Sequence, residues 1–276
     1  MPTEHKHDEV RSRDENFSER VATRIWKEVP SDTNPYVAKG AHLHGYDIRE
    51  LANNKSFVDV FFLLFRGELP SIQEKKLLET MMVLFINPGP RHPATRAAMN
   101  AGVGKTNVGH ILPIGSSLLG GDYLGGGKIE KAMRFFRKNS KKTAQEVFEV
   151  AHKSGPFNCE DGMIESLPGF GRVYGDVDQL AEHFSSQLSD LSEEKSALRW
   201  GCELSKHLNQ VGYGWMIQGV ASAIFSDLGF QPRSGVALFQ LISAPGVVAH
   251  GLELSNKPIT AMPYISDDNY VIEKND

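Results

Sequence analysis

The sequence predicts a mainly α-helical protein, and three observations lead to this fold class. Apolar residues recur at helical spacing in successive segments from about residue 57 to near the carboxyl end. Several of these segments are bounded by glycine, proline or a capping serine. Alternation of apolar and polar residues, which is typical of strands, is scarce. The 276 residues suffice for a large domain with a smaller partner.

Two early helices are predicted from start and stop signals. The segment from Phe57 carries apolar residues on one helical face and closes with Gly67 and Pro70. We expect Ser71 to cap the next helix, because Glu74 follows it at the capping-box spacing. The apolar stripe of that second helix consists of Leu77, Leu78, Met81, Met82 and Phe85.

The remaining helices follow the same spacing. We predict them from Thr95 and over residues 128–138, 143–154, 178–190, 192–209, 213–228 and 236–253, the last containing Pro245. Glycines concentrate over residues 115–127, where a phosphate-binding loop would be one interpretation. The spacing matches neither a P-loop nor a dinucleotide fingerprint, so we favour a turn where helices pack closely.

Charge and cysteine content restrict the possible functions. The net charge is −4, from 30 basic and 34 acidic residues, which disfavours binding to nucleic acid or an anionic membrane and favours a small-molecule substrate. Cys159 and Cys202 are too few for a disulfide framework and lack a metal-ligand spacing. The amino-terminal segment lacks the apolar stretch of a secretory signal. We therefore expect a soluble, cytoplasmic protein with no metal site.

Five segments, in this order along the chain, resemble the citrate synthase superfamily. The size and landmarks are most similar to citryl-CoA lyases and to the citryl-CoA lyase module of ATP citrate lyase. The segments are HGYDIRELANNKSFVDVFFLLFRGELP from His44, GDYLGG from Gly121, PGFGRVYGDVD from Pro168, GVVAHGLE from Gly246 and ITAMPYI from Ile259.

The resemblance implies a two-domain helical fold and an acyl-CoA chemistry. The expected organisation is a flexible amino-terminal arm over residues 1–35, a large dimer-forming domain over 36–127 and 216–276, and a small inserted domain over 128–215. In this superfamily an aspartate removes a proton next to the thioester carbonyl, while two histidines stabilise the enol and polarise the second substrate. A coenzyme A thioester is then a possible substrate, and no permanently bound cofactor is expected.

The chain departs from the superfamily pattern at the residues that perform this chemistry. Arg172 directly follows Gly171, where a histidine is expected, and residues 213–216 contain no aspartate. Three positions that hold citrate-binding arginines in relatives carry other residues, namely Leu180, Ser243 and Met262. We therefore expect a degenerate active site and a ligand that is less acidic than citrate, with an apolar portion.

The candidate site residues combine these motifs with the nearby histidines. The catalytic candidates are Arg172, Tyr174, His110 and His92. The substrate-binding candidates are His42, His44, Arg96, Asp122, Tyr123, Trp215 and His250. The candidates for holding the cofactor portion of the substrate are Gly169, Phe170, Gly171 and Lys105. Structural alternatives stay open: His42 and His44 could shape a turn, His250 could pack in its helix, Asp122 could cap the helix near residue 128, and Lys105 could be solvated.

Three functional hypotheses follow from these residues. The first is an enzyme that makes or breaks a carbon–carbon bond next to an acyl-CoA thioester, on a substrate less carboxylated than citrate. The second is a non-catalytic binding or partner subunit that keeps the fold and a homodimer. The third is an enzyme of another reaction class, since a fold does not fix a function.

Overall fold

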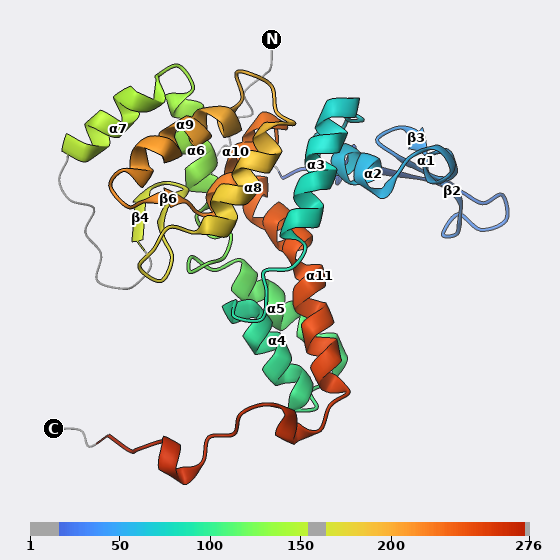
Figure 1. The fold of residues 1–276 in the computed structure, drawn as a ribbon. Helices are drawn as coiled ribbons and strands as arrows, with labels where there is room; N and C mark the ends of the chain where they lie inside the picture. The colour runs from blue at the N-terminus through green and yellow to red at the C-terminus, as the bar shows by residue number, and fades with distance from the viewer. Residues whose placement is uncertain (1–16, 154–163, 274–276) are drawn as a thin grey trace. The chain divides into compact units, whose positions relative to one another are not determined.

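The computed structural model describes residues 17–153 and 164–273, and it confirms the mainly α prediction (Figure 1). The described residues form two compact units, which divide between Glu68 and Leu69. The helices are α1 (Ile48–Asn54), α2 (Phe57–Arg66), α3 (Ile72–Phe85), α4 (Pro93–Val103), α5 (Ile111–Leu119), α6 (Ile129–Asn139), α7 (Ala144–Lys153), α8 (Gln179–Ser189), α9 (Ala197–Asn209), α10 (Ile217–Asp227) and α11 (Gly235–Ser255).

The amino-terminal unit contains a three-stranded antiparallel sheet. Its strands are β1 (Trp26–Pro30), β2 (Ala38–Leu43) and β3 (Tyr46–Asp47), in that order. The prediction of a flexible arm over residues 1–35 is therefore wrong for Trp26–Pro30. The strand depends on pairing with β2, and a pattern within one segment cannot reveal a partner further along the chain.

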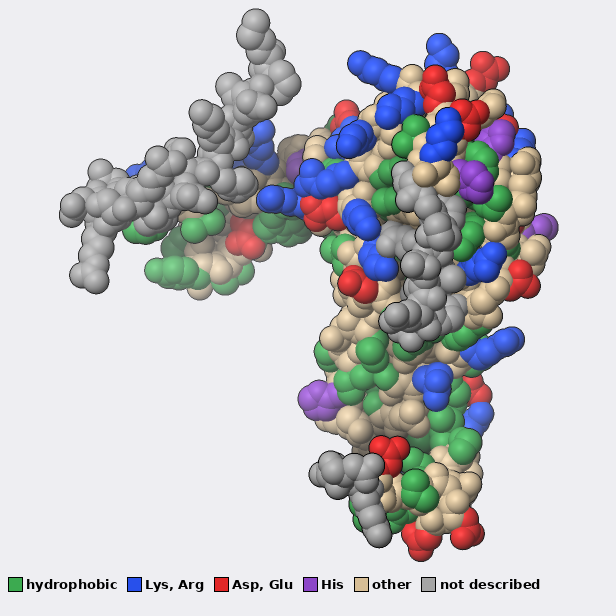
Figure 2. Space-filling view, turned by 90° about the vertical axis from the view of Figure 1, so that its left-hand side faces the viewer, with side chains coloured by type: hydrophobic (Ala, Val, Ile, Leu, Met, Phe, Trp, Pro, Cys, Tyr) green, Lys and Arg blue, Asp and Glu red, His purple; other side chains and the backbone are tan. Residues whose placement is uncertain are grey.

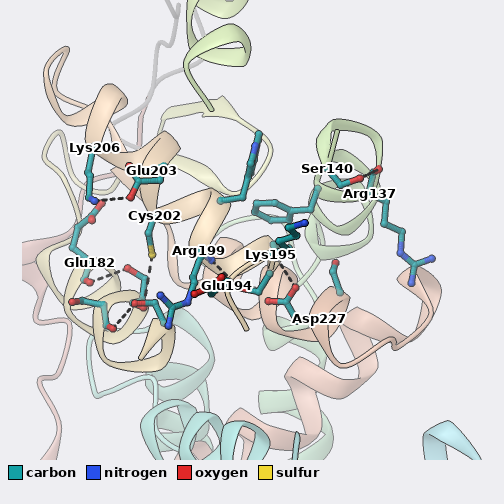
Figure 3. A pocket seen from close by; sticks show the side chains of 18 residues that line it. Arg137, Ser140, Glu182, Glu194, Lys195, Arg199, Cys202, Glu203, Lys206 and Asp227 are labelled. Carbon is teal, nitrogen blue, oxygen red and sulfur yellow. Dashed lines mark hydrogen bonds and ion pairs between the residues drawn. The ribbon is translucent and has the colours of Figure 1, made fainter. Parts of the chain in front are cut away.

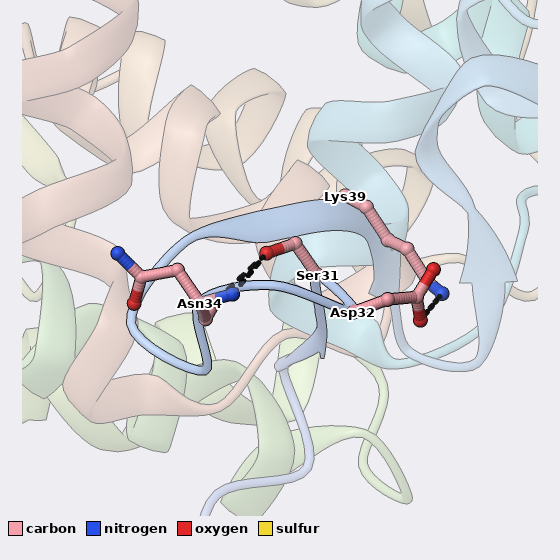
Figure 4. A network of polar contacts seen from close by, with 4 residues as sticks. All are labelled: Ser31, Asp32, Asn34 and Lys39. Atoms are coloured by element: carbon pink, nitrogen blue, oxygen red, sulfur yellow. Dashed lines mark hydrogen bonds and ion pairs between the residues drawn. The ribbon is translucent and has the colours of Figure 1, made fainter.

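Local hydrogen bonds fix the turn between β1 and β2 (Figure 4). Ser31 Oγ donates to the carbonyl oxygen of Asn34 at 2.8 Å, and Asn34 N–H donates back to Ser31 Oγ at 3.0 Å. An exposed ion pair joins Lys39 to Asp32 at 2.6 Å. Serine, asparagine and aspartate favour such turns because their short side chains bond to the nearby backbone.

Both early helices begin where predicted, and the first also ends at the predicted Gly67. Helix α2 begins at a capping box formed by Ser56 and Asp59, and it ends at Gly67 in the left-handed conformation, with φ of 78°. Helix α3 begins at the capping box of Ser71 and Glu74. The sequence located these ends because each capping bond joins residues no more than a few positions apart.

In the unit from Leu69 onward, α4, α5 and α11 lie side by side (Figure 1). The interpretation of the glycine-rich segment as a close-packing turn is confirmed at two positions. A Cβ atom on Gly115 would lie 2.5 Å from Val247 Cγ1, and one on Gly126 would lie 3.0 Å from the Phe239 ring. These glycines therefore let α5 and the following turn approach α11.

A second sheet is formed by strands that lie between the helices α7 and α8 and between α9 and α10 in the chain. Its strands are β4 (Ile164–Leu167), β5 (Phe170–Arg172) and β6 (Gly214–Trp215). The predicted start of the helix at residue 213 is wrong, because Gly214 and Trp215 pair with Gly171 and Phe170, and α10 begins only at Ile217. This pairing joins segments more than forty residues apart, so tertiary structure overrides the apolar helical pattern there.

Helix α11 is the long apolar helix of this unit. The segment Pro232–Ser255 is long and apolar enough to cross a membrane, but half of its most apolar window is buried in the protein, as in the core helix of a folded domain. Pro245 lies within α11 and lacks an N–H, and Gly246 directs its N–H to the carbonyl oxygen of Ile86 at 2.9 Å. The loop after α3 is thereby fixed against the middle of α11.

We expect Gly219→Ala to destabilise the protein by about 3 kcal/mol, because a Cβ there would overlap the backbone of Gly169. The measurement is the free energy of unfolding in urea. Gly40→Ala is the matched control, since its Cβ would have 4.0 Å to the nearest atom, Val29 Cβ. Equal losses in the two variants would contradict the close approach of residues 169 and 219.

Candidate functional site

A cavity of about 200 Å³ lies within the unit from Leu69 onward, and we call it the His92 cavity. Four parts of the chain contribute to it: the end of α3 with the loop to α4, the turn between α5 and α6, the segment from β5 into α8, and residues of α10 and α11. Its lining residues are Leu84, Phe85, Asn87, Pro88, Arg91, His92, Leu124, Val173, Tyr174, Asp178, Leu180, Phe184, Ile217, Gln218, Phe239 and Ser243.

His92 is buried, and both of its ring nitrogens contact the backbone. Nδ1 accepts the N–H of Ala94 at 3.1 Å, which makes His92 the N-cap of α4. Nε2 therefore carries the proton and donates to the carbonyl oxygen of Leu124 at 2.9 Å. Burial lowers the pKa of His92 below its ordinary value, so the ring stays neutral at pH 7. In this geometry His92 holds the turn at Leu124 in place, and neither of its ring nitrogens is free for proton transfer.

The walls of the His92 cavity are mostly apolar, and a few polar groups are distributed among them. Arg91 supplies the guanidinium, and Asp178 supplies the carboxylate. Leu180 and Ser243, at two positions where the resemblance led us to expect arginines, line the cavity. Met262 does not. An apolar cavity with a few placed polar groups is typical of a small-molecule site.

Two lining residues have a positive φ, a backbone conformation that residues other than glycine rarely adopt. Leu124 has φ of 55° and Tyr174 has φ of 53°. Non-glycine residues in the left-handed region cost about 1 kcal/mol or more each and persist only where the surroundings impose them. Their coincidence at one cavity supports a functional role for it. Tyr174 is 66% exposed, so its phenol is accessible to a ligand.

Of the other catalytic candidates, neither Arg172 nor His110 lines the cavity. The Arg172 side chain donates from Nε to the carbonyl oxygen of Gly212 and from Nη2 to that of Val211. Its guanidinium carbon lies 4.3 Å from the centre of the Tyr213 ring. Arg172 therefore stabilises the turn before β6. His110 is exposed at the start of α5.

Three residues of the Pro-Gly-Phe-Gly motif, Gly169, Phe170 and Gly171, are buried in the core. Phe170 and Trp215 are fully buried and stacked, with ring centres 4.3 Å apart. Gly169 packs against the α10 backbone at Gly219, and Gly171 pairs within the sheet. A substrate or cofactor therefore meets none of these side chains in this conformation.

Five further candidates in this unit lie outside the cavity lining. Lys105 donates to the carbonyl oxygens of Ser255 and Lys257 at the end of α11. His250 Nε2 accepts from Asn87 Nδ2 at 3.3 Å, and so helps to place a lining residue. The other three candidates, Arg96, Asp122 and Tyr123, are exposed. No side chain caps α6, so the alternative reading of Asp122 as its cap is wrong.

The two remaining histidine candidates lie in the amino-terminal unit. His42 stands opposite Lys27 in the β1–β2 pairing and lines a shallow hollow that also involves Thr23 and Arg24. His44 has φ of 47°, and its Nε2 lies 3.3 Å from the carbonyl oxygen of Leu64. His44 thus shapes the turn that leads into β3, as the structural alternative proposed.

Sequence reasoning missed four polar residues of the His92 cavity, namely Asn87, Arg91, Asp178 and Gln218. Arg91 precedes a His-Pro helix start, a signal that marks the helix but not the cavity beside it. Asp178 was quoted only as part of a motif, and its Oδ1 accepts the N–H groups of Leu180 and Ala181 as the α8 N-cap. Gln218 gave no signal, because it lies within an apolar helix and its burial depends on packing.

A second, larger hollow of about 1120 Å³ lies among α6, α8, α9 and the end of α10, and we call it the α6–α9 groove (Figure 3). It shares no lining residue with the His92 cavity. At its floor Asp227 accepts the N–H of Ala197 at 2.6 Å and of Leu198 at 3.0 Å. Burial raises the pKa of Asp227 from 3.8 to about 6.

The fold is that of citryl-CoA lyases and citrate synthases. The chain is similar to citryl-CoA lyase from Hydrogenobacter thermophilus, with a TM-score of 0.72 and 23% identity over 93% of this chain and 96% of that one. It is similar to ATP citrate lyase from Methanothrix soehngenii, with a TM-score of 0.64 and 15% identity over 94% of this chain and 44% of that one.

A citrate synthase from Thermoplasma acidophilum is also similar, with a TM-score of 0.59 and 20% identity over 80% of this chain and 58% of that one. The chain thus spans under half of the ATP citrate lyase and nearly all of the citryl-CoA lyase. Neither a protein-family model nor a curated protein sequence matches it. The comparisons therefore show the citrate synthase fold.

We expect Asp227→Asn to remove a pH dependence of stability. A carboxyl whose pKa is raised from 3.8 to about 6 favours folding below pH 4, and this contribution is lost as the pH rises to 6. The loss is about 3 kcal/mol at most, from roughly 2 pKa units at 1.36 kcal/mol each. Urea unfolding of wild type and variant from pH 4 to 6.5 measures it, with exposed Asp267→Asn as control. Parallel curves for wild type and Asp227→Asn would contradict the prediction.

Proposed function

We propose that this protein is an enzyme that makes or breaks a carbon–carbon bond next to an acyl-CoA thioester, on a substrate less carboxylated than citrate. The observation that carries the proposal is the His92 cavity within a citrate synthase fold. Its walls carry no charge at Leu180 and Ser243, the positions where the resemblance led us to expect arginines. A cavity with one guanidinium, that of Arg91, matches a substrate with one carboxylate or none beside an apolar group.

In the cleavage direction the substrate is a 3-hydroxyacyl thioester. The hydroxyl group on C3 loses its proton and becomes a carbonyl, the C2–C3 bond breaks, and its electron pair moves to the thioester as an enolate. Protonation of the enolate at C2 then gives acetyl-CoA. Asp178, as the lining carboxylate, would accept the hydroxyl proton, while Arg91 and Tyr174 would donate to the developing oxyanion.

A second candidate function is a non-catalytic binding or partner subunit. Two contacts favour it, since His92 has both nitrogens on backbone groups and Arg172 is held by backbone carbonyls. The roles of a proton-relaying histidine and of an oxyanion-stabilising arginine are thus unavailable to His92 and Arg172 in this conformation. A binding protein needs the cavity but no acid or base in it.

We expect Asp178→Asn to lower the rate of thioester cleavage at least about 100-fold, the usual contribution of a general base. Asparagine is as good an N-cap as aspartate, so the stability should change little. Mass spectrometry of released acetyl-CoA gives the rate, and urea unfolding gives the stability. Asp176→Asn is the control, because Asp176 lies in the same loop outside the cavity lining.

The substrate panel contains citryl-CoA and 3-hydroxyacyl-CoA thioesters with apolar or aromatic groups on C3. Turnover of apolar members, with citryl-CoA inert, agrees with the first candidate function. A thermal shift by apolar acids without any turnover would replace it with the second. If neither turnover nor a shift by any member is found, both candidates are wrong.

We also propose that the protein is cytoplasmic, because a free cysteine such as Cys202 is typical of a reducing compartment.

We further propose that two copies of this chain associate through α5 and α11. Helix α5 contains no ionisable side chain, although 23% of all residues are charged. Its Leu112 is 50% exposed. On α11, Leu241 and Leu252 are 51% and 40% exposed. Exposed apolar residues on neighbouring helices are typical of a subunit interface.

We expect Leu112→Glu combined with Leu241→Glu to convert a dimer into a monomer, because two carboxylates would be buried without partners. Light scattering after size exclusion should give about twice the 30.6 kDa chain mass for wild type and once that mass for the variant. The control is Ile72→Glu on α3, where the replaced side chain is 92% exposed. A monomeric wild-type protein would contradict the proposal.

A further inference from the structure

The part of the His92 cavity that α10 and α11 contribute carries no ionisable side chain. It consists of Ile217, Gln218, Phe239 and Ser243, and we call it the α10–α11 wall. Gln218 and Ser243 are only 4% and 2% exposed. Lys, Arg, Asp and Glu side chains, by contrast, lie on the outside of the protein, as the face drawn in Figure 2 shows. The two polar groups of this wall are therefore neutral and buried.

The carboxamide of Gln218 is poorly satisfied within the protein. Its Nε2 lies 3.7 Å from Met216 Sδ, and a thioether sulfur is a weak acceptor. Its Oε1 accepts no hydrogen bond from any residue that the structure describes. A buried amide that lacks good partners is costly, because its groups have lost their hydrogen bonds to water. Gln218 thus keeps an acceptor and a donor for a molecule in the cavity.

The hydroxyl group of Ser243 also has no hydrogen-bond partner in the described part of the chain. A serine within a helix often donates to the carbonyl oxygen four residues earlier. On α10, Ser222 donates in this way to Gln218 at 2.6 Å, and Ser226 donates to Ser222 at 2.8 Å. Ser243 makes no such bond to Phe239. Its hydroxyl group is therefore left for a ligand that occupies the cavity.

Both side chains stand on firmly packed backbone. Gln218 lies in the first turn of α10, beside Gly219, whose backbone packs against Gly169. Ser243 lies on the part of α11 where Gly246 is hydrogen-bonded to the loop after α3. Binding groups that are already held in place lose little conformational freedom when a ligand arrives.

We propose that the α10–α11 wall binds a hydroxyl group on the apolar portion of the ligand. A hydroxyl group both donates and accepts, so it can donate to Gln218 Oε1 while it accepts from Ser243 Oγ–H. A methyl group in its place would leave both side chains unpaired. A carboxylate cannot donate to Oε1 and meets no cation on this wall.

The proposal rests on the proposed function only in taking the His92 cavity as the ligand site. It narrows the substrate to one whose apolar group carries a hydroxyl group of its own, in addition to the hydroxyl on C3 that reacts. Binding at the α10–α11 wall requires no reaction, so it can be measured with unreactive acids.

Calorimetric titration of the full chain with matched acids tests the proposal. The probes are 6-hydroxyhexanoate, heptanoate and heptanedioate, which share a carboxylate and the same methylene chain and differ in the group at the far end. The shared carboxylate can pair with Arg91, which also lines the cavity. We expect 6-hydroxyhexanoate to bind at least about fivefold more tightly than either of the others, because only its hydroxyl group satisfies both buried side chains.

Two variants, Ser243→Ala and Gln218→Leu, each remove one of the hydrogen-bonding groups. We expect each to weaken the binding of 6-hydroxyhexanoate at least about fivefold and to change that of heptanoate less than about twofold. The ratio of the two affinities within one variant thus reports the hydroxyl group and not the packing. Ser185→Ala is the matched control, because Ser185 is also 2% exposed but lies outside the cavity lining.

Urea unfolding shows which variants fold, and the comparison of the probes on the wild-type protein decides even if a variant does not. Binding of heptanoate or heptanedioate as tight as that of 6-hydroxyhexanoate would overturn the proposal. An unchanged affinity ratio in either folded variant, or no binding of any probe, would also overturn it. A hydroxyl preference without thioester turnover supports this proposal and refutes only the reaction, whereas turnover without that preference refutes only this proposal.

Discussion

The close approach of two backbones, at Gly169 and at Gly219, is the constraint on which the rest of the carboxyl-terminal unit depends. The carbonyl oxygen of Gly169 accepts the N–H of Met216, and the neighbouring rings of Phe170 and Trp215 stack in the core. This contact fixes where β5 and α10 begin. The loop that carries Tyr174 and Asp178 leaves directly from this fixed point, so the geometry of the His92 cavity depends on it.

The motif residues thus have a different role from the one that their place in a catalytic signature implied. Pro-Gly-Phe-Gly residues pack, and Arg172 fastens a turn, while the following residues form the cavity wall. His92 likewise uses both ring nitrogens to hold α4 and Leu124. The polar groups left to meet a ligand, Arg91 and Asp178 among them, sit within apolar walls, and this balance favours a ligand with little charge.

The two hollows differ in the physical basis of recognition. The His92 cavity is small and apolar, so the shape and the desolvation of a ligand decide what binds there. The α6–α9 groove is larger, and four basic and four acidic side chains line it, so a ligand there must match a surface of mixed charge.

The sequence by itself determined the helices and their caps, because these depend on residues a few positions apart, as at Ser71 and Glu74. It also located the cavity positions 180 and 243, through the order of landmarks along the chain. Tertiary structure alone decided that residues 26–30 and 214–215 are strands, because their hydrogen-bond partners are distant in sequence. Tertiary structure also decided the hydrogen-bond partners of His92 and Arg172. Whether a side-chain nitrogen stays free for a ligand depends on which backbone carbonyl groups the fold brings next to it.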